Sequence, residues 1–203
     1  TKDIFHLIPY DYDNTYGIDW FNINWTNANP YNYPKVSGGY RPLAERLMQN
    51  AQYRNLYTHF LEFYRTNVYQ LSIWDNKINS LRSMIAQSAL SDSFRTLDYG
   101  FDTNDFFNSY NESGYSNQHV KYGIKEFVNL KNSQLPGLLS YQSAKPIAYK
   151  IDYEPKNPTA NDSIYVYASA FDNDGLAEVS IHFQANGSST TQIYQMNYSP
   201  VSN

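Results

Sequence analysis

Residues 3–17 read Asp-Ile-Phe-His-Leu-Ile-Pro-Tyr-Asp-Tyr-Asp-Asn-Thr-Tyr-Gly, a short apolar run followed by an acidic turn. Successive side chains of a strand point to opposite faces, so Asp11 and Asp13 share one face if the strand continues that far. Gly17 allows the chain to bend where a Cβ atom would clash. The stretch therefore predicts a strand that delivers two carboxylates into a tight turn.

The acidic turn offers oxygen atoms of the type that Mg²⁺ prefers. Asp11 and Asp13 are the candidate metal ligands, and the side chains of Asn14 and Thr15 are candidate supporting groups. Asp and Asn are also ordinary turn residues. The spacing alone therefore leaves two interpretations open, a metal site and an acidic turn that closes a strand.

Composition excludes several classes of protein. The 203 residues predict one or two domains, and a hydrophobic content of 41% is enough for a core. A net charge of −4 argues against nucleic-acid binding, for which a basic face is typical. The chain has no Cys, hence no disulfide or thiolate site, and no apolar run of membrane-spanning length.

The same composition indicates an exported bacterial protein. The chain is rich in Tyr, Asn and Ser and low in charge, and it contains 21 Tyr and 11 Phe. The residues before the acidic motif show no basic start and no cleavable apolar core, so we expect no signal peptide within this chain. The chain also stops within a segment of strand character, so we expect it to be a piece of a longer protein.

Helical periodicity dominates the middle of the chain. Residues 18–39 read as a long loop packed by its aromatic side chains. Pro42 and Asn50 are the expected starts of two helices. The second helix carries an apolar stripe of Leu56, Phe60, Tyr64 and Val68.

Two further helices are predicted after these. The third lies around residues 74–85, and a polar loop follows over residues 99–115. The fourth covers about 117–133, and Leu135-Pro136-Gly137 ends or interrupts it.

The pattern changes after Ser143-Ala144-Lys145-Pro146. Alternating segments over residues 147–153, 163–171, 176–183 and 191–196, separated by turn dipeptides, predict short strands of an immunoglobulin-like sandwich. Residues 146–203 are fewer than the roughly 100 residues of a complete sandwich. We therefore expect the β domain to be incomplete.

The motif at residues 11–17, followed by Tyr-Arg-Asn-Leu-Tyr at 53–57, resembles the spore-coat-protein-H (CotH) kinase family. Members show a strand, a D-x-D-x-T-aromatic-Gly motif, a Leu-rich helix and a Tyr-Arg-x-x-Tyr helix. Residues 123–133 resemble the late helix of the family, with Lys131 where Arg is more usual. The resemblance runs from about Ile4 to about Tyr141.

This resemblance implies an atypical protein kinase that transfers phosphate from ATP to protein Ser. It places Asp11 and Asp13 at the position that binds Mg²⁺ or Mn²⁺ with ATP. The implied fold is α+β and multidomain. A mainly helical kinase-like C-terminal lobe occupies residues 1–142, and an incomplete Ig-like or fibronectin-III-like sandwich occupies residues 146–203.

The sequence also departs from the family pattern in its nucleotide-binding elements. It contains no Gly-rich phosphate loop. It also contains no equivalent of the Lys that pairs with the ATP phosphates, since Lys2, which precedes the motif, lies too close to it in sequence to serve. The expected partner is therefore a missing N-terminal lobe of the same protein, together with a protein substrate or a surface glycan. We expect this fragment alone to be inactive.

Alternatives follow from the same residues. A non-catalytic exported surface or carbohydrate-associated protein that keeps the fold is the main one. A haloacid-dehalogenase-type phosphatase, with Asp11 as nucleophile, needs a strand–helix alternation that the chain does not show. An EF-hand loop from Asp11 would need Gly and Glu where Tyr16 and Asn22 stand. Asp172 and Asp174 are Ca²⁺ candidates, but a hairpin turn is favoured there.

Overall fold

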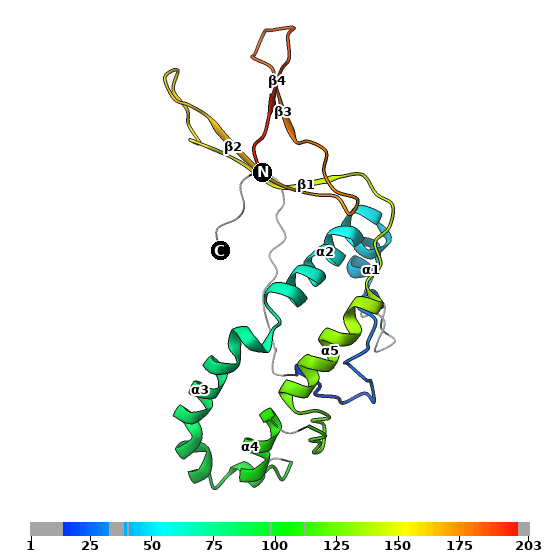
Figure 1. Ribbon diagram of the computed structural model, residues 1–203, viewed down its shortest axis with the longest axis vertical. Coiled ribbons are helices and arrows are strands. Elements are labelled where there is room, and N and C mark those ends of the chain that lie inside the picture. Colours follow the sequence, from blue (N-terminus) through cyan, green and yellow to red (C-terminus); the bar gives the residue numbers. More distant parts are fainter. Residues whose placement is uncertain (1–13, 33–38, 40, 98, 112, 199–203) are drawn as a thin grey trace. The chain divides into compact units, whose positions relative to one another are not determined.

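The computed structural model describes residues 14–32, 39, 41–97, 99–111 and 113–198 (Figure 1). The helices are α1 (Pro42–Gln49), α2 (Ala51–Asn67), α3 (Leu71–Ser91), α4 (Thr103–Asn111) and α5 (Ile124–Leu138), with a short 3-10 turn at Arg95–Leu97. The strands are β1 (Ile147–Glu154), β2 (Tyr165–Phe171), β3 (Ser180–Phe183) and β4 (Gln192–Gln195). Helices thus precede strands, and the predicted α+β class is confirmed.

Two compact units divide the chain. The first comprises Thr1–Arg46 and Phe60–Ser140, and the second comprises Leu47–His59 and Tyr141–Asn203. The start of α2 therefore belongs with the strands, and the rest of α2 belongs with the other helices. The predicted domain bounds, 1–142 and 146–203, stay a prediction.

The core of the first unit lies around α4 and α5. Helix α4 packs beside both α3 and α5 (Figure 1). Val128 and Tyr110 are almost fully buried. The other buried apolar side chains come from α5 and from two loops: Phe127, Leu135, Tyr31 and Tyr115. The helical lobe is therefore closed by loop aromatics as well as by helix packing.

The predicted start of α2 is confirmed in detail. The Asn50 side-chain oxygen accepts hydrogen bonds from the backbone N–H groups of Gln52 (3.0 Å) and Tyr53 (3.2 Å). These are two of the donors that a helix leaves unpaired at its start. Asn50 is therefore the N-cap.

The predicted apolar stripe of α2 is not its most buried face. Phe60 (42%) and Tyr64 (52%) remain exposed, whereas the buried residues of the helix are polar, Asn55 and Thr58. The Asn55 side chain pairs with both backbone groups of Gln142, accepting at 2.6 Å and donating at 2.5 Å. The most buried face of α2 is therefore the one that carries Asn55 and Thr58.

Helix α4 lies where the sequence predicted a loop. Asp102 accepts hydrogen bonds from the backbone N–H groups of Asn104 (2.7 Å) and Asp105 (3.1 Å), and its own N–H donates to the Asp105 carboxylate (2.7 Å). This reciprocal pattern is a capping box with Asp at both positions. It stabilises a start that the polar composition concealed.

Helix α5 begins later and ends later than predicted. It starts at Ile124 rather than near Asn117, because Asn117 instead pairs with Val120 in an isolated bridge. It continues through Pro136 to Leu138. Pro136 has no N–H to donate to the carbonyl four residues earlier, but it lies in the last turn, where the helix tolerates this loss because it ends at Leu138.

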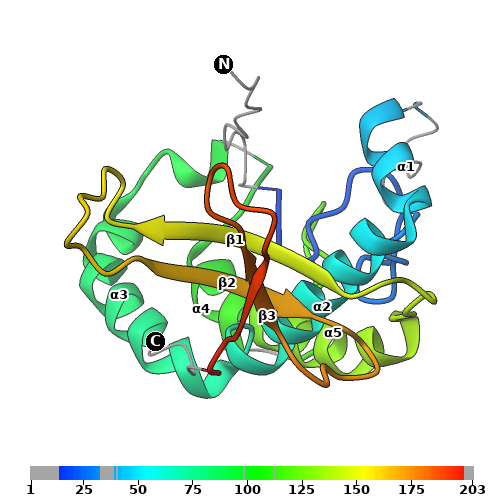
Figure 2. The same ribbon diagram turned by 90° about the horizontal axis from the view of Figure 1, so that it is seen from above.

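The strands form two antiparallel pairs. In β1–β2, Ile147 pairs with Phe171 and Glu154 with Tyr165, with an irregularity between Tyr149 and Asp152. Figure 2 shows β1 and β2 side by side. In β3–β4, Ser180 pairs with Gln195. Among the described residues these are two separate two-stranded sheets, so the predicted sandwich is not shown.

The Asp172–Gly175 segment is a turn, as predicted. The Asp172 side chain accepts from the Asp174 N–H at 3.1 Å, the Gly175 N–H donates to the Asp172 carbonyl at 3.2 Å, and Gly175 has φ +92°.

None of the helices in the described part of the chain combines the length and apolar composition needed to cross a membrane.

Candidate functional site

The structure describes the second half of the acidic motif. Asp11 and Asp13 lie outside the described residues, so their role as metal ligands stays a prediction. Asn14 and Thr15 are described, and both are exposed. Within the described ranges, no three His, Asp or Glu side chains cluster in a way that could hold a metal ion.

The motif ends in a tight turn. The Ile18 N–H donates to the Thr15 carbonyl at 3.3 Å, and the two residues between them, Tyr16 and Gly17, have φ of +53° and +89°. A positive φ is strained for most side chains but not for glycine. The bend predicted at Gly17 is confirmed.

Gly17 is also the point where the turn touches helix α5. A Cβ atom on Gly17 would lie 2.8 Å from the Phe127 ring and 3.1 Å from the Tyr122 ring. The neighbouring Ile18 forms an isolated bridge with Val120. The described end of the motif therefore packs directly against the start of α5 and the residues before it.

Tyr16 joins this turn to an aromatic cluster. Its ring lies 6.1 Å from that of Tyr69, 6.4 Å from that of Trp74 and 6.4 Å from that of Phe127, between ring centroids. A cavity of about 270 Å³ adjoins these rings, lined by Tyr16, Tyr64, Val68, Tyr69, Trp74, Ile78, Tyr110 and Ile124. Burial raises the pKa of the Tyr69 hydroxyl, so it stays neutral at physiological pH.

Asn14, a predicted supporting ligand, is engaged by Trp20. The Trp20 indole N–H donates to the Asn14 side-chain oxygen at 2.8 Å. The Trp20 ring stacks on the His119 ring, with centroids 4.0 Å apart and planes 18° from parallel. The residue directly after Asp13 is thus tied to the loop that follows the turn.

Comparison with known proteins identifies the helical part of the chain. The family model described as CotH kinase protein matches residues 1–135. The chain belongs to the CotH kinase protein family. No curated protein and no solved structure matches it. The CotH match includes the acidic motif and most of α5, and it confirms the resemblance noted from the sequence.

Asp19 organises the loop that follows the CotH motif. It is 7% exposed, and its carboxylate accepts hydrogen bonds from the N–H groups of Phe21 (3.0 Å) and Ile23 (3.0 Å) and from the Trp25 indole (3.3 Å). Burial alone would raise the pKa of the Asp19 carboxyl, but these donors outweigh burial and lower it. Asp19 was not among the site residues predicted from the sequence. Its bond to the Phe21 N–H is an Asx turn, which the presence of an Asp in a loop allows but does not specify.

Lys131 holds the same loop from helix α5. Its ammonium group donates to the carbonyls of Trp25 (3.1 Å) and Ala28 (3.4 Å). Burial lowers the pKa of Lys131. Lys131 stands where Arg is more usual in the CotH family, and its ammonium group reaches both carbonyls.

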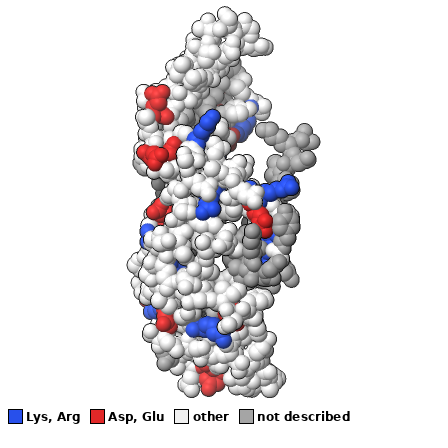
Figure 3. All heavy atoms as spheres, turned by 90° about the vertical axis from the view of Figure 1, so that its right-hand side faces the viewer, with Lys and Arg blue, Asp and Glu red and all other residues white. Residues whose placement is uncertain are grey.

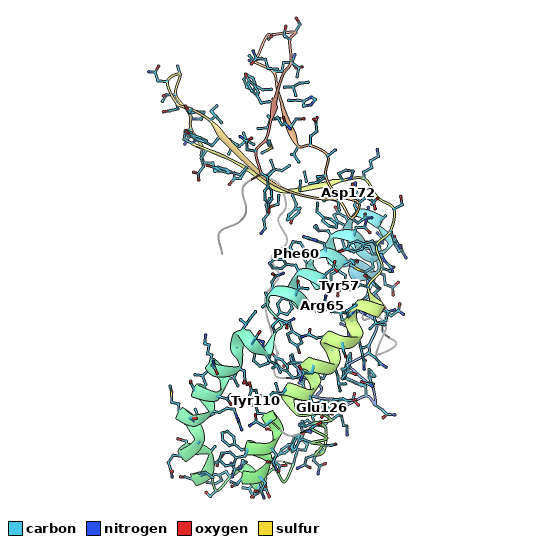
Figure 4. The ribbon with its side chains drawn as sticks, viewed as in Figure 1. Tyr57, Phe60, Arg65, Tyr110, Glu126 and Asp172 are labelled. Carbon is cyan, nitrogen blue, oxygen red and sulfur yellow. The ribbon has the colours of Figure 1, made fainter. Side chains whose placement is uncertain are left out.

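A polar cluster joins three helices of the CotH lobe. The Tyr110 hydroxyl donates to Asp75 at 2.6 Å, and the Lys125 ammonium lies 2.9 Å from the same carboxylate oxygen. Arg82 lies 4.8 Å and Lys125 4.9 Å from the centroid of the Tyr110 ring, which sits between α3 and α5 (Figure 4). No local pattern could predict a cluster whose members are so far apart in sequence.

Two further carboxylates of the described helical unit, those of Asp105 and Glu126, accept hydrogen bonds from groups of the protein itself. Asp105 accepts from the Tyr115 hydroxyl (2.8 Å) and the Asn117 amide (3.0 Å), and Glu126 accepts from the Gly114 N–H (2.7 Å). Acidic and basic side chains are mixed on the face shown in Figure 3. These carboxylates therefore stabilise loops rather than gather at one place.

Proposed function

We propose that this chain is part of an ATP-dependent protein Ser kinase, in which Asp11 and Asp13 bind Mg²⁺ or Mn²⁺ together with the ATP phosphates. The observation that carries the proposal is the CotH kinase match over residues 1–135, which contains the acidic motif. The donor set suits the ion, because carboxylate oxygens are the ligands that Mg²⁺ prefers.

Phosphoryl transfer depends mainly on positioning and on neutralising phosphate charge. A metal ion on the phosphates would supply part of that neutralisation. The described residues would contribute position. Gly17 seats the turn on Phe127 and Tyr122, and Asn14 is held by Trp20.

The decisive test replaces Asp11 or Asp13 by Asn in the complete protein that contains this chain. We expect either change to lower the rate of phosphate transfer from ATP to protein Ser by about a hundredfold or more, because charge stabilisation at the reacting phosphate is lost. Glu178→Gln, an exposed acidic residue of the second unit, is the matched control. Circular dichroism checks that each variant folds, and full activity in Asp11→Asn would refute the proposal.

An exported surface protein that keeps the CotH fold without catalysis is the competing proposal. Two consecutive exposed aromatic residues favour it, since Trp20 is 50% and Phe21 64% exposed, and aromatic side chains are enriched at binding surfaces. It predicts no phosphate transfer by the complete protein even with both Asp residues intact. Binding to surface glycans would then be the next measurement.

We also propose that residues 146–203 form part of an Ig-like module of an exported bacterial protein. The support is the series of four short strands joined by turns, with strand pairing that is antiparallel throughout the described pairs. A solved structure of a longer chain would test it. Pairing of β1–β2 and β3–β4 as two facing sheets would support the module, and continuous helices there would exclude it.

A further inference from the structure

The cavity of the helical unit has the size and the lining of a small-molecule site. Its volume is about 270 Å³, and most of its described lining is aromatic: Tyr16, Tyr64, Tyr69, Trp74 and Tyr110. An apolar cavity of about 150 Å³ is already enough to hold a benzene molecule. These lining residues all belong to the first compact unit, so the cavity does not depend on how the two units are arranged.

This aromatic cavity has a buried floor and an open mouth. Tyr110 is 2% exposed, and its hydroxyl donates to Asp75 at 2.6 Å. Tyr64 and Val68, which line the same cavity, are 52% and 40% exposed. A ligand can therefore enter past Tyr64 and Val68 and reach, at the Tyr110 end, a ring that is already held in place.

Tyr69 lies at the centre of the aromatic lining. Its ring is close to parallel with those of Tyr16 (13°) and Tyr64 (30°), at centroid distances of 6.1 Å and 5.9 Å. The Trp74 ring lies 6.5 Å from it at a tilt of 45°. Aromatic rings at such separations attract one another beyond the effect of the area they bury. A planar aromatic ligand would make the same kind of contact with this lining.

Several polar groups of the lining are available to a ligand. Among the described residues, the hydroxyls of Tyr16, Tyr64 and Tyr69 and the indole N–H of Trp74 donate no hydrogen bond within the protein. Burial and, to a smaller extent, the nearby hydroxyls of Tyr16 and Tyr64 raise the pKa of Tyr69, so its hydroxyl stays protonated and can donate. A ligand oxygen that accepts from Tyr69 would pair a donor that is otherwise unpaired.

The charges beside the cavity disfavour a cationic ligand. Aromatic cages are typical sites for quaternary ammonium groups. Here, however, the Arg82 guanidinium and the Lys125 ammonium lie 4.8 Å and 4.9 Å from the centroid of the Tyr110 ring. Asp75 offsets one of these charges through its contact with Lys125 at 2.9 Å, and none of the described lining residues is acidic. A neutral ligand therefore suits the cavity better than a cation.

We propose that the aromatic cavity binds a small neutral aromatic molecule that carries a hydroxyl or carbonyl oxygen. Its ring lies among the aromatic side chains, and its oxygen accepts a hydrogen bond from Tyr69. Small-molecule sites are commonly built in this way, from apolar and aromatic side chains with a few polar groups that fix orientation. The inference goes beyond the proposed kinase activity and does not rest on it.

The first experiment titrates the complete protein with p-cresol and three comparison probes by calorimetry. We expect a p-cresol dissociation constant of about 0.1 to 1 mM, which is ordinary for a ligand of so few atoms. Toluene keeps the aromatic ring without the oxygen, and 4-methylcyclohexanol keeps the oxygen without the aromatic ring. Each should bind about threefold to tenfold more weakly, because one type of contact is lost. Choline, the cationic probe, should not bind.

The second experiment locates the bound p-cresol with variants. Val68→Trp places a large ring at the mouth and should abolish binding, whereas Ile73→Trp, at a 59% exposed position of α3 outside the lining, is the matched control. Tyr69→Phe keeps the ring and removes the hydroxyl. It should weaken p-cresol about threefold to tenfold and leave toluene unchanged. Thermal unfolding checks that each variant folds.

The results that would overturn the proposal are distinct. Absence of p-cresol binding, or binding that Val68→Trp leaves unchanged, excludes the cavity as the site. Equal affinity for p-cresol and either toluene or 4-methylcyclohexanol excludes the ligand class. Choline binding tighter than that of p-cresol shows an ammonium cage instead. A p-cresol affinity that Tyr69→Phe does not lower excludes the hydrogen bond. None of these measurements involves phosphate transfer, so each outcome leaves the proposed kinase function to its own test.

Discussion

Position 17 requires glycine for two independent reasons: its backbone conformation, and the lack of space for a Cβ atom. Its φ of +89° favours glycine, and a Cβ atom would lie 2.8 Å from Phe127. The sequence predicted the bend, because Gly follows an acidic turn. It could not predict the contact, because Phe127 lies in a helix more than a hundred residues further along the chain.

Gly17→Ala should therefore destabilise the first unit by more than backbone strain alone. Gly100→Ala is the matched control, since Gly100 has φ +74° but open space around it. We expect Gly100→Ala to cost about 1 to 2 kcal/mol from strain, and Gly17→Ala to cost about 1 to 3 kcal/mol more from overpacking. Urea unfolding of both variants measures the difference, and equal losses would contradict the close contact.

Asp19 makes stability depend on pH. The pKa of its carboxyl is lower in the folded protein than the ordinary value of 3.8. Its contribution is therefore fully present above pH 3.8 and is lost as pH falls from there through the folded-state pKa. At neutral pH, Asp19→Asn should cost about 1 to 3 kcal/mol, because an acceptor of charge-assisted hydrogen bonds is removed.

Thermal unfolding of wild type and Asp19→Asn between pH 2.5 and 7 tests this expectation. The difference in free energy of unfolding between wild type and Asp19→Asn should narrow below pH 3.8. Protonation then removes from wild type the charged acceptor that the variant already lacks. Asp92→Asn is the control, because its one exposed acceptor contact, to the Phe94 N–H, suits an amide oxygen equally well. A gap that stays constant down to pH 2.5 would contradict the assignment.

At the scale of elements, local chemistry predicted the helix starts better than the covered faces. Asn50 was predicted as an N-cap from its neighbours, and it is one. The apolar stripe of α2 did not predict the buried face, because Asn55 buries its amide to pair with Gln142, and such pairing across the chain leaves no periodic pattern. Helix α4 was missed because the Asp102 capping box lies in a stretch whose Gly, Asp, Asn and Ser residues are typical of loops.

Asn55 is a buried polar side chain that joins α2 to Gln142 and Asn173 within the second unit. It is 2% exposed and makes three hydrogen bonds, two with Gln142 and one with the Asn173 side chain (3.1 Å). Asn55→Ala should cost about 1 to 3 kcal/mol, because three hydrogen bonds of a buried side chain are lost. Hydrogen exchange of the Gln142 amide should accelerate.

The control for Asn55→Ala is Gln52→Ala, an exposed position one turn earlier on the same helix. It should change stability by less than about 0.5 kcal/mol. If the two variants lost equal stability, the hydrogen bonds of Asn55 would not be the cause. Unchanged exchange at Gln142 would lead to the same conclusion.

At the scale of the whole molecule, the order of elements was predictable and the assembly of strands was not. The change from helical to alternating periodicity near residue 146 is matched by the observed order, α5 ending at Leu138 and β1 starting at Ile147. Whether two hairpins face each other depends on contacts between strands far apart in sequence. The alternation of β1 and β2 specifies a face for each strand but no partner for that face.

The last prediction concerns residues 1–203 in isolation. Binding ATP requires groups that neutralise triphosphate charge, and this sequence contains no Gly-rich phosphate loop. Two carboxylates without phosphate oxygens are also weak ligands for Mg²⁺, which gives up its waters reluctantly. We therefore expect no measurable ATP hydrolysis or autophosphorylation, and Mg²⁺ dissociation constants of roughly millimolar or weaker.

Titration calorimetry with Mg-ATP measures the affinity of residues 1–203 for the nucleotide directly, with Asp11→Asn as the matched variant. Micromolar affinity in the unmodified chain would place the nucleotide site within these residues, and its loss in Asp11→Asn would assign it to the acidic turn.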